Sequence, residues 1–100
     1  MKSERADIIR DVLMEDGYES KDQVVDSFTI MIVLSKIDKY KSECAKYEKK
    51  YDCSLDALKS RIEKMEGEEE FEIEDDLMDW EFAENAKKLW QKRLEVLNSA

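Results

Sequence analysis

The chain has 100 residues, enough for one domain with a modest core, and it contains no proline and only two glycines. So few turn-forming residues favour long helices over a turn-rich β fold. The chain carries 26 acidic and 17 basic residues, a net charge of −9. This charge argues against direct binding to nucleic acid or an anionic membrane, and it favours a basic protein partner.

The residue types that most catalytic and cofactor sites need are missing from the sequence. Without histidine there is no ordinary general base near neutral pH. The two glycines lie too far apart for a phosphate-binding loop, and Cys44 and Cys53 cannot make a zinc site by themselves. We therefore expect no enzymatic activity, no catalytic residues, no cofactor and no metal site.

The cysteines and the apolar runs also suggest a cellular location. Two reduced thiols are favoured over a disulfide between Cys44 and Cys53. The charged N-terminus is unlike a signal peptide, and the longest apolar run, Ile30–Leu34, is far shorter than a membrane span. These features predict a cytoplasmic protein.

Two helices are predicted in the first half of the chain. The first spans residues 3–15, with Ser3 as its N-cap and Gly17 as the residue that stops it. Ser20 and Gln23 form a capping box that starts the second helix. A strand is the alternative over residues 28–34, where several residues are β-branched, but the cap and the lack of a turn residue before Asp52 favour a helix.

The second helix is apolar almost all round between Phe28 and Leu34, which predicts burial on more than one side. In a chain this short, we expect that helix to form the centre of a homodimer; the alternative is the core helix of a monomer. The predicted dimer interface consists of Val24, Val25, Phe28, Met31, Ile32 and Ser35. A further apolar seam follows at Ile37, Tyr40, Cys44, Tyr47 and Tyr51.

Two more helices are predicted in the second half. Ser54 caps a third helix, and a fourth runs from near Glu74 to about Leu97. The predicted fold is all-α, with about four helices, a long central helix, antiparallel packing and an intertwined homodimer. Residues 1–53 are expected to be a helical dimerisation core. Residues 54–100 are expected to be a two-helix partner-binding region with an acidic linker over residues 66–76.

The charge of the chain is concentrated in residues 66–84, which hold eleven acidic side chains and no basic one. Residues 1–65 are nearly neutral, with 14 acidic and 13 basic residues. Large apolar side chains alternate with these carboxylates. A tail that only keeps the protein in solution would lack such apolar side chains. Packing within the protein would account for Leu77, Trp80 and Ala83. The predicted partner-binding residues are Phe71, Ile73, Asp75, Asp76, Met78, Asp79, Trp80, Glu81 and Phe82.

The segment from Gly17 to Phe28 resembles small prokaryotic antitoxins of the ribbon-helix-helix type, which commonly read G-Y-x-S-x-x-x-V-V-x-x-A before an apolar helix. In that family the unit is a dimerisation core, so the resemblance implies a dimer. The DNA-reading strand of the family precedes the first helix. Because this sequence begins directly with a helix, we do not expect it to bind DNA directly.

The second half of the chain resembles small proteins of prokaryotic toxin–antitoxin gene pairs. The resemblance rests on Tyr47–Tyr51, on Ser54-Leu55, on the acidic stretch and on a D-D-x-x-x-W-E element at residues 75–81. It implies a protein that binds and silences a toxin, often a ribonuclease, through Phe71, Asp75, Asp76, Trp80 and Glu81. One alternative is a coiled-coil adaptor or scaffold without a nuclease partner. Another is an acidic calcium-binding module, although the alternating Glu70–Glu74 stretch lacks the glycine of an EF-hand loop.

Overall fold

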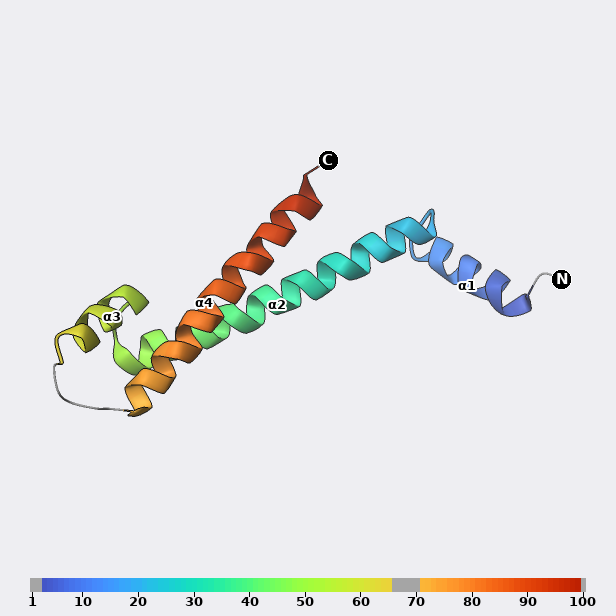
Figure 1. The fold of residues 1–100 in the computed structure, drawn as a ribbon. Coiled ribbons are helices and arrows are strands. Elements are labelled where there is room, and N and C mark those ends of the chain that lie inside the picture. Colours follow the sequence, from blue (N-terminus) through green and yellow to red (C-terminus); the bar gives the residue numbers. More distant parts are fainter. Residues whose placement is uncertain (1–2, 66–70, 100) are drawn as a thin grey trace. The chain divides into compact units, whose positions relative to one another are not determined.

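The computed structural model describes residues 3–65 and 71–99, and these residues form four helices and no strand (Figure 1). The helices are α1 (Glu4–Glu15), α2 (Lys21–Tyr51), α3 (Leu55–Glu63) and α4 (Phe71–Asn98). The predicted all-α fold with a long second helix is thereby confirmed. Residues 28–34 lie within α2, so the helix, and not the strand, is correct there.

The turn between α1 and α2 has the predicted caps. The backbone N–H of Ala6 donates to the hydroxyl of Ser3 at the start of α1. Gly17 adopts φ +96°, and the N–H groups of Gly17 and Tyr18 donate to the carbonyls of Met14 and Leu13. These two bonds form a Schellman motif, which needs a left-handed residue at Gly17.

The capping box of α2 is also present, with a small change in register. The N–H of Gln23 donates to the Ser20 hydroxyl at 3.2 Å, as expected. The Gln23 side chain accepts a bond of 2.8 Å from the N–H of Glu19, one residue before the cap. Both bonds satisfy backbone donors that no helical carbonyl reaches.

The chain turns sharply between α2 and α3. Asp52 adopts a left-handed conformation with φ +52°, which aspartate tolerates better than most residues. Ser54 then caps α3, because its hydroxyl accepts a 3.1 Å bond from the N–H of Ala57. The interruption predicted between the second and third helices is therefore confirmed.

Helix α4 begins at Phe71, three residues earlier than the sequence analysis predicted. Residues 71–76 of the expected acidic linker are therefore helical, while residues 66–70 lie outside the described residues. The early start is consistent with helix electrostatics. Glu72 and Glu74 lie in the first turn, where the positive end of the helix dipole favours carboxylates.

The chain divides into two compact units, residues 1–32 and residues 33–100. The boundary falls inside α2, whereas the sequence analysis placed it after residue 53. The difference has a physical reason: residues 40–51 of α2 pack with α3 and α4, because their large side chains belong to the same core. Whether residues 1–53 act as a dimerisation core stays a prediction.

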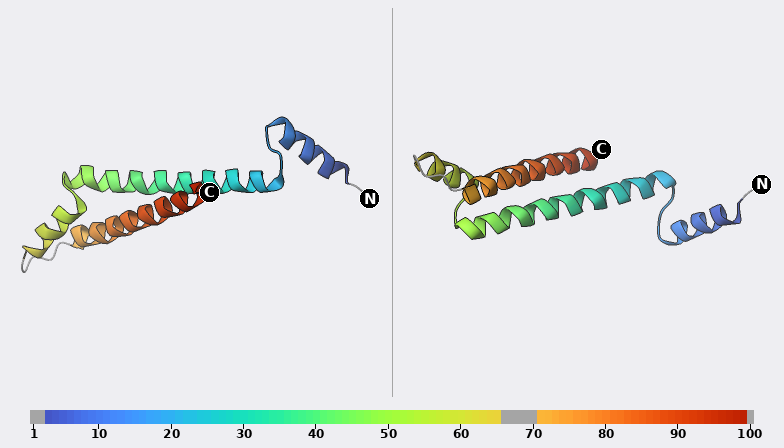
Figure 2. Two further views of the ribbon diagram at one scale, coloured as in Figure 1. Left: turned by 90° about the horizontal axis from the view of Figure 1, so that it is seen from above. Right: turned by 60° about the horizontal axis from the view of Figure 1, so that its bottom comes forward.

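In the second unit, the last turns of α2 and the first half of α4 run side by side in opposite directions (Figures 1 and 2). Side-chain contacts fix this antiparallel order, because Lys50 meets Asp76, Tyr47 meets Trp80, and Cys44 meets Glu84. The α2 side of the interface follows alternating steps of three and four residues, the spacing of a coiled-coil seam: Val33, Ile37, Tyr40, Cys44, Tyr47 and Tyr51. Antiparallel helix packing is thereby confirmed. Helix α3 closes the core with Leu58, which is fully buried.

The first unit has a different character, because none of its described residues, 3–32, is buried. Its apolar side chains lie largely in solvent. No helix in the described part of the chain is both long and apolar enough to cross a membrane.

Candidate functional site

The face of α4 that packs against α2 contains three residues that the sequence analysis assigned to partner binding. Trp80 is only 1% exposed and lies in the core with Tyr47, Leu58 and Ala83. Its indole ring stacks on the ring of Tyr47 at 5.9 Å between centroids. The structure therefore places Trp80 where a partner docked on the outside of the unit does not reach it. Ile73 is half-buried against the same core.

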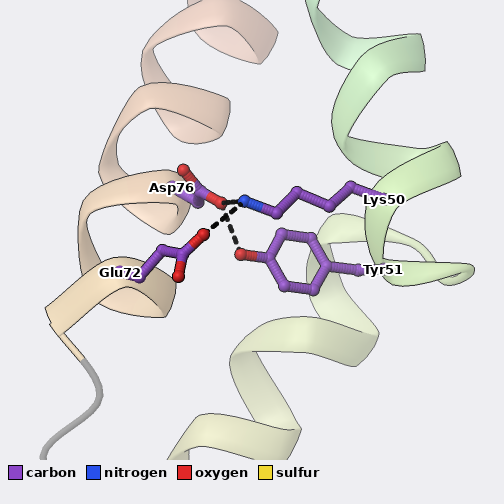
Figure 3. A network of polar contacts seen from close by, with 4 residues as sticks. All are labelled: Lys50, Tyr51, Glu72 and Asp76. Atoms are coloured by element: carbon purple, nitrogen blue, oxygen red, sulfur yellow. Dashed lines mark hydrogen bonds and ion pairs between the residues drawn. The ribbon is translucent and has the colours of Figure 1, made fainter.

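The third inward-facing residue, Asp76, joins α4 to the end of α2 in a polar network (Figure 3). Its carboxylate accepts hydrogen bonds from the Lys50 ammonium and the Tyr51 hydroxyl, and Lys50 also pairs with Glu72 at 3.0 Å. Hydrogen bonds from Lys50 and Tyr51 lower the pKa of Asp76. Burial, with the bond to Asp76, raises the pKa of Tyr51 to about 12. Asp76 is thus ionised and already paired within the chain.

Glu81 points toward α3, where it pairs with Lys59 at 3.1 Å. It borders a cavity of about 340 Å³ between α2, α3 and α4 that carries both signs of charge, with Glu48, Asp56, Glu84 and Lys88 also in its lining. Both members of the Lys59–Glu81 pair remain about 40% exposed. Exposed ion pairs of this kind contribute little to stability, so Glu81 can give up its pairing with Lys59 and pair with a cationic side chain of a partner instead.

A polar layer interrupts the seam one turn further along α4. The Cys44 thiol is buried and bonds to the Glu84 carboxylate, which also pairs with Lys87 at 3.0 Å. Burial, together with the hydrogen bond to Glu84 and the charge of its carboxylate, raises the pKa of Cys44 to about 11. Cys44 and Cys53 are free thiols, in agreement with the reading of two reduced cysteines.

The remaining assigned residues lie together on the outer face of α4. Asp75, Met78, Asp79 and Phe82 follow the spacing i, i+3, i+4 and i+7, which places them on one side of a helix. Met78 is 68% exposed and Phe82 is 64% exposed, and both aspartates are exposed. Phe82 is oriented by an edge-to-face contact with Tyr40 of α2. We refer to these four residues as the acidic–aromatic face.

Phe71 begins α4, but its side chain lies outside what the structure describes. Of the nine residues assigned to partner binding, the structure thus brings four to one exposed face and turns Ile73, Asp76 and Trp80 inward. Sequence reasoning did not identify Lys50, Tyr51 and Lys59 as the residues that hold the acidic segment in place. The signal for Tyr51 was present, because it ends the apolar seam of α2.

The residues assigned to the dimer interface all lie in or just beyond the first unit. Val25, Phe28 and Met31 are 61–64% exposed, Ile32 and Ser35 are exposed, and Val24 is half-buried. Leaving large apolar side chains this exposed to water is unfavourable in free energy compared with burying them. Their role in a dimer stays a prediction.

Comparison of the chain with protein-family models, with curated proteins and with solved structures found no match. Any statement on function therefore has to come from the residues themselves.

Proposed function

We propose that this chain is a non-enzymatic, antitoxin-like cytoplasmic protein that forms a homodimer and binds a basic protein, neutralising it. The acidic–aromatic face of α4 is the binding surface. The single observation that carries the proposal is the exposure of Met78 and Phe82 between Asp75 and Asp79 on that face. The nature of the target as a toxin, often a ribonuclease in such gene pairs, follows from the resemblance of the acidic segment and not from the geometry.

The fold supports this use of α4 because it presents the face on a rigid element. The stacking of Trp80 on Tyr47 and Tyr51 fixes the rotation of α4 about its axis. The Lys50 network fixes the start of the helix at Glu72 and Asp76. With these inner contacts satisfied, the outer face needs little reordering when a partner binds, and such preorganisation lowers the cost of association.

The chemistry of the face suits a cationic surface with an apolar contact at its centre. Phe82 and Met78 supply apolar area that a partner would cover, and aromatic side chains often dominate interface energetics. Asp75 and Asp79 flank them and would attract lysine or arginine side chains. A protein whose ordinary ligand is nucleic acid offers such a cationic surface, so the face would compete with that ligand.

The test uses the product of the neighbouring gene where this encodes a small basic protein. We expect the double substitution Met78→Ser/Phe82→Ser to weaken binding at least about 30-fold, the equivalent of one hot-spot residue of about 2 kcal/mol. The matched control is Leu89→Ser/Val96→Ser, which removes similarly exposed side chains from the same helix outside the acidic segment. Equal affinities for the two double variants by calorimetry would exclude the acidic–aromatic face as the binding surface.

The alternative is a helical coiled-coil adaptor or scaffold without a nuclease partner. The heptad-like seam of α2 from Val33 to Tyr51 is the observation that favours it. The two proposals differ in the charge of the partner, because a scaffold has no requirement for a basic one. Binding that is insensitive to Asp75→Lys/Asp79→Lys would favour the scaffold.

A further inference from the structure

The first unit contains no core of its own. Among residues 3–32 no side chain is buried, although eight large apolar ones are exposed: Ile8, Ile9, Val12, Met14, Val25, Phe28, Met31 and Ile32. A helix of 12 residues such as α1 is marginal in water without tertiary packing. To be stable as a helix, α1 therefore needs to pack its apolar side on a surface that the first unit does not provide.

Helix α1 offers one broad apolar side. At 100° per residue, Ala6, Ile8, Ile9, Val12 and Leu13 fall within an arc of about 160°, wider than the stripe of a typical surface helix. Ile8 and Val12 are each 56% exposed, and Ile9 is 46% exposed. A hollow of about 300 Å³ opens beside Ile9 and Leu13, bounded by Met14 and Tyr18.

The start of α2 offers a second apolar side of similar size, formed by Val25, Phe28, Met31 and Ile32. Met14 lies on the opposite side of α1, and each of the other seven exposed side chains exposes on the order of 100 Å², about half of a large side chain. Together they expose about 700 Å², close to the roughly 800 Å² that one partner contributes to a standard stable interface. The unit thus carries the area that a dimer needs, divided between two helical faces.

We infer that α1 of one copy packs on the Val25–Phe28–Met31 face of a second copy, and reciprocally. This inference rests on the homodimer of the proposed function, and it adds residues of α1 to an interface whose six predicted residues all lie on α2. A twofold arrangement covers both apolar faces of both chains at once. A contact between the two α2 helices alone would leave the apolar side of α1 in water.

The charges next to the two faces fit the same pairing. Arg5 lies within the apolar arc of α1, while Asp22 and Asp26 lie beside Val25 on α2. None of these three residues makes an ion pair with another described residue. The start of α2 carries Asp22 and Asp26 against the single Lys21, so packing α1 there brings Arg5 beside a net negative charge. Packing α1 on α1 would place the two arginines together.

Disulfide cross-linking between full-length chains tests the arrangement. The background carries Cys53→Ser and retains Cys44, which is 2% exposed. A tagged Val12→Cys chain is mixed with an untagged Phe28→Cys chain and oxidised gently. We expect the mixed disulfide to exceed both homodimeric ones. Asp11→Cys, on the charged side of α1, is the matched control and should give at least about tenfold less mixed product at equal time.

Each outcome decides the inference. Cross-links confined to pairs of Phe28→Cys chains would show that α2 packs on α2. In a chain that carries both Val12→Cys and Phe28→Cys, a disulfide within that chain would show that α1 folds back on its own α2. Either result overturns the inference. The molar mass of the wild-type protein, measured by light scattering, tests the homodimer of the proposed function separately from the contact made by α1. A dimer without the mixed cross-link overturns only the α1 contact, whereas a monomer overturns the homodimer as well. Partner binding through α4 is measured separately and does not enter either readout.

Discussion

The indole of Trp80 lies against the phenol ring of Tyr47, with 5.9 Å between the ring centroids and 22° between the ring planes. Tyr51 stacks on the same indole at 6.4 Å and 13°. Three aromatic rings from two helices thus form the centre of the second unit. An aromatic residue inside an acidic segment is here a structural residue, and this decides which substitutions can test function.

Loss of the Trp80 ring should destabilise the second unit. Trp80→Ala is expected to cost about 3–5 kcal/mol, because it removes a fully buried aromatic side chain. Trp80→Phe should cost clearly less, because the indole N–H that it removes has no hydrogen-bond partner among the described residues. Urea unfolding of the two variants and the wild type measures the difference. Wild-type stability of Trp80→Ala would contradict the observed core.

The Asp76 network should make stability depend on pH on the acidic side. The folded state lowers the pKa of Asp76, so its contribution is present above the unfolded value of about 4 and is lost as pH falls through the lowered value. Melting temperatures measured between about pH 2 and pH 7 should therefore fall toward the acidic end. In Asp76→Asn this fall should be smaller, because the substituted residue does not titrate. If the melting temperature of Asp76→Asn falls at low pH as much as that of the wild type, other carboxylates control the acid dependence.

The two cysteines should react at very different rates. The pKa of Cys44 is raised to about 11 and the thiol is buried, so almost no thiolate is present near neutral pH. Cys53 is only partly buried. A thiol reagent at about pH 8 should modify one cysteine quickly and the second only as the protein unfolds. Rapid modification of both in the native protein would show that the seam at Cys44 is open.

The acidic residues of α4 should control the rate of association with a basic partner. Asp75→Lys/Asp79→Lys reverses the charge of the acidic–aromatic face without touching the core, since both residues are exposed. We expect an association rate at least about tenfold lower at low salt, with a weaker dependence on ionic strength than the wild type. Surface plasmon resonance over a range of salt concentrations measures both. An unchanged rate would show that the charge of this face does not steer binding.

The helices could be predicted from the sequence because their ends carry local chemical signals. Ser3, Ser20 and Ser54 cap the helices as expected, and Gly17 adopts the left-handed conformation that ends α1. These signals depend on a few neighbouring residues and need no knowledge of the tertiary fold. The spacing of Ile37, Tyr40, Cys44, Tyr47 and Tyr51 likewise predicted a seam that the structure shows.

The candidate site was only partly predictable, because the sequence does not show which side of α4 faces α2. Trp80 and Phe82 are both aromatic and both stand among carboxylates, yet one is 1% exposed and the other 64%. The choice depends on pairs distant in sequence, such as Lys50 with Asp76 and Lys59 with Glu81. The start of α4 was placed too late for a related reason, since its acidic residues were treated as a solvated linker.

Co-expression with the product of the neighbouring gene tests the central claim most directly. The account predicts that the wild-type chain co-purifies with a small basic protein and suppresses its toxicity, and that Met78→Ser/Phe82→Ser loses both effects while remaining helical by circular dichroism. Leu89→Ser/Val96→Ser should retain both. Recovery of the chain alone, with the toxicity of a basic neighbour unaffected, would contradict the proposal that this protein is an antitoxin.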